Sequence, residues 1–111
     1  MKTYKKATVI ALEDSIEYTE GGVISKQVTK NEAGNITLFS FDKGQGSSEH
    51  TANFDAFVQI LDGAAEIRID GTPRLLKKGD CIIMPAGPPH ALQAVERFKM
   101  LLTMNRGSEQ N

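Results

Sequence analysis

The two histidines of the chain are its clearest candidates for chemistry. His50 follows a polar run at residues 44–49, and His90 follows a proline- and glycine-rich segment at residues 85–89. Imidazole binds metal ions and exchanges protons near neutral pH more readily than any other side chain. Because the chain has no third histidine and only one cysteine, a metal or acid–base site would depend on these two positions.

Glycines lie on the N-terminal side of both histidines, and prolines also precede His90. The first segment, residues 44–63, is marked by Gly44, His50 and Gly63. The second, residues 79–94, is marked by Gly79, Pro85, Gly87 and His90. In these intervals the chain resembles the cupin family, and most of all its small one-domain bacterial members. The resemblance implies an all-β fold, the cupin-type double-stranded β-helix (jelly-roll) barrel, also called RmlC-like.

The resemblance also implies a metal site of three histidines and one glutamate, which this chain keeps only in part. Ala52 stands at the second histidine position and Ala56 at the glutamate position, so His50 and His90 are the two metal ligands that remain. Asp55 and Gln59 are candidate helpers. On a regular strand, however, Asp55 would face away from the glutamate position, since neighbouring side chains alternate between faces. If a divalent transition metal is held, the family indicates Fe, Mn, Ni or Zn.

Aromatic and methionine residues in the predicted strands could line a pocket near the histidines. Core packing is the more ordinary role for each of them. Ala52 and Ala56 have small side chains that would leave room in such a pocket. The candidate wall residues are Phe39, Phe41, Phe57, Met84, Phe98 and Met100.

Short β-rich segments separated by turn residues predict eight or nine strands in one domain spanning residues 1–111. Asp62-Gly63 and Asp70-Gly71 are each typical of a two-residue hairpin turn. We expect an ordered loop at 85–89 and a polar tail at 106–111. Strands are predicted at residues 23–29, 36–41, 57–61, 64–69, 74–76, 81–84, 90–95 and 97–103, with either a strand or a helical turn at 8–12.

Composition and charge restrict the partners that we expect. A net charge of −1 offers no basic surface for nucleic acid, and the apolar runs are too short to cross a membrane. The N-terminus does not resemble a secretory signal, and the single Cys81 is expected to be an inert buried thiol, so a cytoplasmic protein is predicted. The resemblance adds the expectation of a homodimer.

Three functions stay open at this point. The favoured one is binding of a small organic ligand in the barrel pocket, without enzymatic activity and without a tightly bound metal. The second is a metal-dependent enzyme of the oxygenase or isomerase type that uses an incomplete site at His50 and His90. The third is metal-free acid–base catalysis by a histidine.

Overall fold

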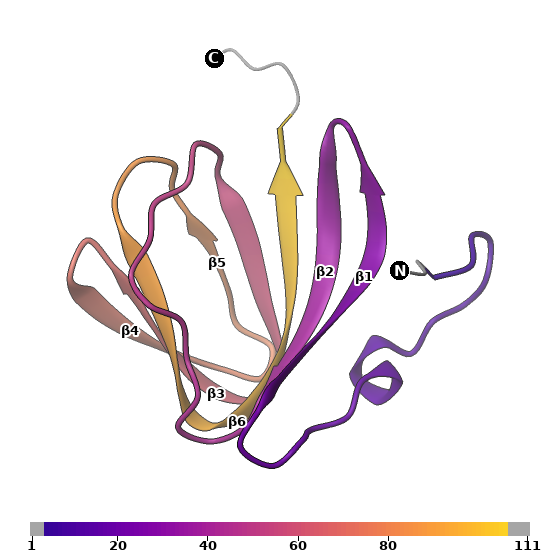
Figure 1. The fold of residues 1–111 in the computed structure, drawn as a ribbon, viewed down its shortest axis with the longest axis horizontal. Helices are drawn as coiled ribbons and strands as arrows, with labels where there is room; N and C mark the ends of the chain where they lie inside the picture. The colour runs from indigo at the N-terminus through magenta and orange to yellow at the C-terminus, as the bar shows by residue number, and fades with distance from the viewer. Residues whose placement is uncertain (1–3, 107–111) are drawn as a thin grey trace.

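The computed structural model describes residues 4–106. Its strands form one antiparallel sheet that curls into an open barrel (Figure 1). This confirms the all-β, jelly-roll prediction. A short 3-10 helix, η1 (Leu12–Ser15), comes before the strands. The strands of the described part are β1 (Val23–Asn31), β2 (Gly34–Phe41), β3 (Ala56–Ile69), β4 (Thr72–Lys77), β5 (Cys81–Met84) and β6 (His90–Asn105). None of the helical structure within residues 4–106 has the length and apolar character needed to span a bilayer.

Two long strands form the centre of the sheet, whose order is β1-β2-β6-β3-β4, with β5 paired to β3. β3 has 14 residues and β6 has 16. The prediction of eight or nine short strands was therefore wrong, because pairs of predicted strands join into one. The loop between β2 and β3 adds two isolated bridges to the first half of β6, at Gly46 and at His50.

The predicted hairpin at Asp62-Gly63 was also wrong, because β3 continues through these residues. Gly63 has a φ of +77°, as a type I′ turn would require, but it uses that conformation in a bulge opposite Phe98. A Cβ at this position would lie only 1.8 Å from the carbonyl oxygen of Arg97. The bulge changes which residues face inward, from Val58 before it to Ala65 after it.

The second Asp-Gly pair does form the predicted hairpin. Asp70 and Gly71 have φ angles of +53° and +82°, and Ile69 pairs with Thr72 across the turn. Both central residues thus adopt the left-handed conformation of a type I′ connection.

The inward faces of the strands form one hydrophobic core. The rings of Phe41 and Phe98 stack at a centroid distance of 4.7 Å, and Phe98 is completely buried. Alternating residues of β6 all contribute to the inner side, as the sequence predicts. They are Phe98, Met100, Leu102 and Met104.

The segment before β1 lies on the outside of the barrel, beside β1 in Figure 1, and contacts the outward-facing side chains of β2. Ile16 and Leu38 are buried there, and the hydroxyl of the buried Ser40 donates a 2.7 Å hydrogen bond to the carbonyl of Glu17. Neither prediction for residues 8–12 was right, because residues 8–11 have no regular structure and η1 begins only at Leu12.

Two side chains predicted to be internal lie on the outer face. Cys81, the first residue of β5, is exposed, so the prediction of a buried thiol was wrong. Phe57 is 38% exposed and pairs with the exposed Ile83. The exposure of both side chains follows from the register of β3, in which Ala56 and Val58 face inward and their neighbours outward. Cys81 pairs with one of these outward-facing neighbours, Gln59.

Candidate functional site

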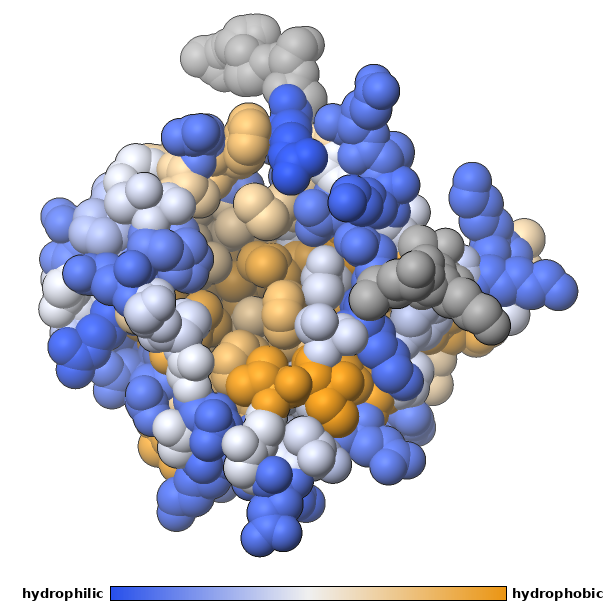
Figure 2. All heavy atoms as spheres, viewed as in Figure 1, coloured by the Kyte–Doolittle hydropathy of each residue, from blue (hydrophilic) through white to orange (hydrophobic). Residues whose placement is uncertain are grey.

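A cavity of about 330 Å³ lies inside the barrel and contains both histidines. In Figure 2 hydrophobic side chains form the floor of a central hollow, with more hydrophilic residues around its rim. The walls are largely apolar. The cavity is lined by Phe39, Phe41, Ser47, His50, Thr51, Ala52, Ala56, Met84, His90, Leu92, Met100, Leu102 and Met104.

Two loops are tied together beside the histidines. The N–H of Gly87, in the loop before β6, donates to the carbonyl of Ala52 at 3.0 Å. The N–H of Ala86 donates to the carboxylate of Asp55 at 2.9 Å. Gly87 has a φ of +104°, a conformation that side chains other than glycine rarely adopt. These contacts fix the β5–β6 loop against the β2–β3 loop.

His50 and His90 are brought together by their own backbones. The N–H of His50 donates to the carbonyl of His90 at 3.0 Å, and the reverse bond measures 2.8 Å. The two rings meet edge to face, with centroids 4.5 Å apart and planes at 75°. The histidines therefore form one polar group at the cavity.

The two imidazoles have different surroundings. Nδ1 of His50 lies 3.0 Å from the carbonyl of Ser48, so Nδ1 carries the hydrogen and donates it, which leaves Nε2 as the free nitrogen of an exposed ring. His90 is only 3% exposed, and its Nδ1 has no hydrogen-bond partner within residues 4–106.

Burial, followed by the positive charge of a protonated His50, lowers the pKa of His90 from its ordinary value of 6.5. The backbone carbonyl of Pro88 acts in the opposite direction, although less strongly. His90 is accordingly neutral at neutral pH.

The structure brings most of the predicted pocket residues together at this cavity. The exceptions are Phe98, which packs beneath Phe41, and Phe57, which lies on the outer face of β3. The two helpers proposed from the sequence, Asp55 and Gln59, do not line it either. The predicted residues that line it are His50, His90, Ala52, Ala56, Phe39, Phe41, Met84 and Met100.

The donor atoms at the cavity do not fit the four-ligand metal site that the family implies. No group of three or more histidine, cysteine, aspartate or glutamate side chains in the described part of the chain is arranged to hold a metal ion. Asp55 is hydrogen-bonded to the β5–β6 loop. Gln59 lies between the inward-facing Val58 and Ile60, so it faces the opposite side of β3.

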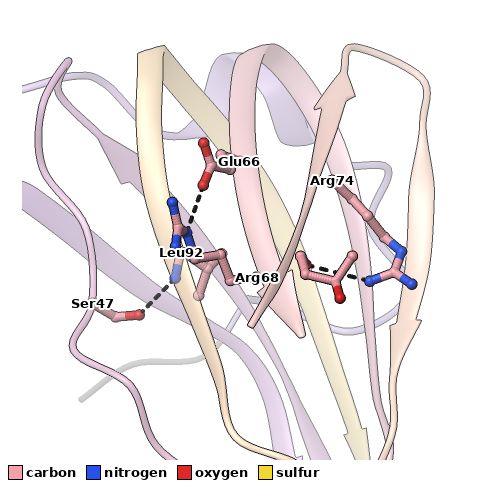
Figure 3. Close-up of polar contacts among 6 residues, drawn as sticks. Ser47, Glu66, Arg68, Arg74 and Leu92 are labelled. Atoms are coloured by element: carbon pink, nitrogen blue, oxygen red, sulfur yellow. Dashed lines mark hydrogen bonds and ion pairs between the residues drawn. The ribbon is translucent and has the colours of Figure 1, made fainter. Parts of the chain in front are cut away.

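The sequence prediction missed five residues that line the cavity. Leu92 lies two residues after His90, on the same face of β6. Side chains on a strand alternate between faces, so this pattern could have identified Leu92, Leu102 and Met104 as wall residues. Ser47 and Thr51 lie in a loop whose path no local pattern reveals. In Figure 3 the hydroxyl of Ser47 accepts a 3.1 Å hydrogen bond from the N–H of Leu92.

Three charged side chains of β3 and β4, those of Glu66, Arg68 and Arg74, bond to groups outside the cavity. Arg68 forms a 2.7 Å ion pair with Glu66, and Arg74 contacts a backbone carbonyl at 3.4 Å (Figure 3). None of the three lines the cavity. The polar side-chain groups that the described residues bring to the cavity are thus two imidazoles and two hydroxyls.

Comparison with known proteins identifies the family. Residues 37–104 match the family model described as a cupin domain. An uncharacterized protein of Aquifex aeolicus is 30% identical over 95 residues, which cover 84% of this chain and 78% of that protein.

Two crystal structures are similar to the chain over nearly its whole length. A conserved protein of unknown function from Streptococcus pyogenes is 38% identical, with a TM-score of 0.90 and coverage of 97% of this chain and 95% of that one. A cupin superfamily protein from Desulfitobacterium hafniense is 32% identical, with a TM-score of 0.86 and coverage of 94% and 95%. The chain belongs to the cupin family.

Proposed function

We propose that this cupin-barrel protein binds a small organic ligand in the cavity at His50 and His90, without a tightly bound metal. The observation that carries the proposal is the cavity itself, a largely apolar hollow of about 330 Å³ with its polar groups gathered at the two histidines. Ligand sites in proteins are concave, mostly apolar and supplied with a few polar groups that fix orientation.

The two alanines at the family's ligand positions support ligand binding over metal chemistry. Ala52 and Ala56 both line the cavity, where histidine and glutamate side chains would occupy part of the space. Two imidazoles without a third ligand make a weak metal site in competition with other chelators. A metal-dependent oxygenase or isomerase is therefore the less supported alternative.

Methyl NMR of the methionines tests the proposal directly. Three methionines, Met84, Met100 and Met104, line the cavity, so their ¹³C-labelled methyl groups report on its contents. A library of small organic molecules should include compounds that shift these three signals. Ala52→Leu, which fills the cavity from the loop side, should abolish the shifts. The matched control Ala33→Leu changes an exposed turn residue outside the cavity and should preserve them.

The proposal fails if no compound in the library shifts the three signals. It also fails if Ala52→Leu binds the same compounds as the parent, because the binding would then lie elsewhere.

A further inference from the structure

The polar groups at the cavity indicate what kind of molecule it takes. We propose that the ligand is a small organic acid, with an apolar body of about ten heavy atoms in the hollow and a single carboxyl group at His50 and His90. This deepens the proposed function and rests on it.

The absence of charged side chains in the walls limits the charge of the ligand. Within residues 4–106, none of the residues that line the cavity is an aspartate, glutamate, lysine or arginine. The carboxylate of Asp55 is hydrogen-bonded to Ala86, and that of Glu66 is paired with Arg68. A cationic ligand would lose its hydration without gaining a counter-charge, which is costly in an apolar site.

The hydrogen-bonding capacity of the polar groups suits a carboxyl group. Because the Ser48 carbonyl takes the hydrogen of Nδ1, Nε2 of His50 can accept the O–H of a carboxylic acid. The acid then enters the cavity as a neutral group, with its O–H donated to Nε2 and its carbonyl oxygen left to accept a second hydrogen bond.

A second donor is available at the same cavity. The oxygen of Ser47 accepts the N–H of Leu92, so the hydroxyl hydrogen of Ser47 is not used in that bond. Thr51 also lines the cavity and makes no side-chain hydrogen bond to the described residues. Hydroxyl donors of this kind can serve the second oxygen of a carboxyl group.

Volume and wall composition set the size and polarity of the rest of the ligand. Water takes roughly 30 Å³ per molecule in the liquid, so the cavity holds on the order of ten heavy atoms. Apart from the histidines, the hydroxyl residues and the two alanines, the described part of the chain contributes only phenylalanine, methionine and leucine side chains to the walls. The body of the acid is therefore apolar, and a second charged group on it would meet no partner.

The test uses four probes of similar size, namely phenylacetate, phenylacetamide, phenethylamine and ethylbenzene. Each is titrated into the protein while the methyl signals of Met84, Met100 and Met104 are followed by NMR. We expect phenylacetate to bind at least tenfold more tightly than phenylacetamide, and phenethylamine to bind most weakly. His50→Ala should weaken phenylacetate about tenfold, as loss of a hydrogen bond implies, and leave ethylbenzene unchanged.

Two controls keep the test interpretable. His50 is exposed, so its replacement should preserve folding, and circular dichroism checks this for both His50→Ala and the more conservative His50→Gln. Arg74→Gln changes an exposed residue outside the cavity and should bind all four probes like the parent.

The outcomes separate the two proposals. If the amide or the amine binds as tightly as the acid, or if neither His50 variant weakens the acid, the assignment of an acid is overturned while cavity binding stands. If none of the probes shifts the three methionine signals at millimolar concentration, and the wider library also fails, the proposed binding function is itself overturned.

Discussion

His50 and His90 exchange two backbone hydrogen bonds of 3.0 and 2.8 Å while their rings meet edge to face. One histidine comes from the loop that crosses the barrel, and the other begins β6. Their backbone bonds therefore fix the loop to the sheet at the point where the side chains face the cavity. Backbone groups of the two residues thus join the loop to the sheet, while their side chains supply the imidazoles of the cavity.

The buried imidazole of His90 makes the stability of the protein depend on pH. Its pKa is lowered in the folded state by burial and by His50, so below the ordinary value of 6.5 the unfolded chain binds more protons than the folded chain. The free energy of unfolding should therefore fall as the pH drops from 8 to 5. Urea denaturation at several pH values measures this, and His90→Gln should flatten the slope.

Asp42 also has a shifted pKa, but its effect on stability should fall at a lower pH than that of His90. Hydrogen bonds from the backbone N–H groups of Gly21 and Lys43 lower its pKa from 3.8. Its contribution to stability is therefore lost only below about that value, outside the window assigned to His90. A slope between pH 8 and 5 that survives His90→Gln would contradict the assignment.

Restoring the two missing ligands should create a metal site. Ala52 and Ala56 line the cavity with both histidines, so Ala52→His combined with Ala56→Glu would complete the family's ligand set. We expect the double variant to retain one equivalent of Zn²⁺ or Fe²⁺ after dialysis, measured by elemental analysis, while the parent retains little. The same double variant with His90→Ala is the control and should lose the metal. Tight metal binding by the parent would overturn the metal-free proposal.

The bulge at Gly63 should be far less tolerant of substitution than the turn at Gly71. Both glycines have positive φ angles, of +77° and +82°. Gly71→Ala adds a Cβ in open space and should cost about 1–2 kcal/mol of backbone strain. Gly63→Ala adds the same strain and also a clash with the Arg97 carbonyl, so its loss of stability should exceed that of Gly71→Ala. Thermal unfolding compares them, and equal losses would refute the steric argument.

Tyr18 should hold the N-terminal segment against the barrel. Its hydroxyl donates a 2.5 Å hydrogen bond to the carboxylate of Asp62, and the guanidinium of Arg97 lies 4.4 Å from the centre of its ring. Tyr18→Phe removes the hydrogen bond and keeps the ring, and it should cost about 1 kcal/mol at this half-buried position. Tyr4→Phe, which loses a bond to Ser15, is the matched control. A larger loss from Tyr4→Phe would show that Tyr18 is not the main attachment.

Homodimer formation stays a prediction. β1 is the outer strand of the sheet, and such an edge can pair with a second chain. Sedimentation equilibrium should give twice the chain mass of 12.1 kDa. Val23→Lys, on β1, should shift the protein toward monomer, whereas Val95→Lys, on β6 and similarly exposed at 43% against 44%, should not. A monomeric parent would refute the prediction.

Local sequence patterns determined much of the fold and the position of the site. Residue types that favour extended backbone located the strand-forming segments, and Asp70-Gly71 located a true hairpin because its positive φ angles match that turn. The intervals around His50 and His90 placed both on the barrel, and the alanines at the other ligand positions were visible without any structure.

Tertiary pairing decided the rest. Asp62-Gly63 has the residue types of a hairpin turn, yet β6 is long enough to pair with β3 on both sides of it, so the positive φ of Gly63 forms a bulge. Whether a chain reverses at such a pair depends on which strand is available to bind it, and that partner is distant in the sequence. The burial of each side chain likewise depends on how the sheet is assembled. The assembled sheet buries Phe98 beneath Phe41 and leaves Cys81 exposed on the outer face.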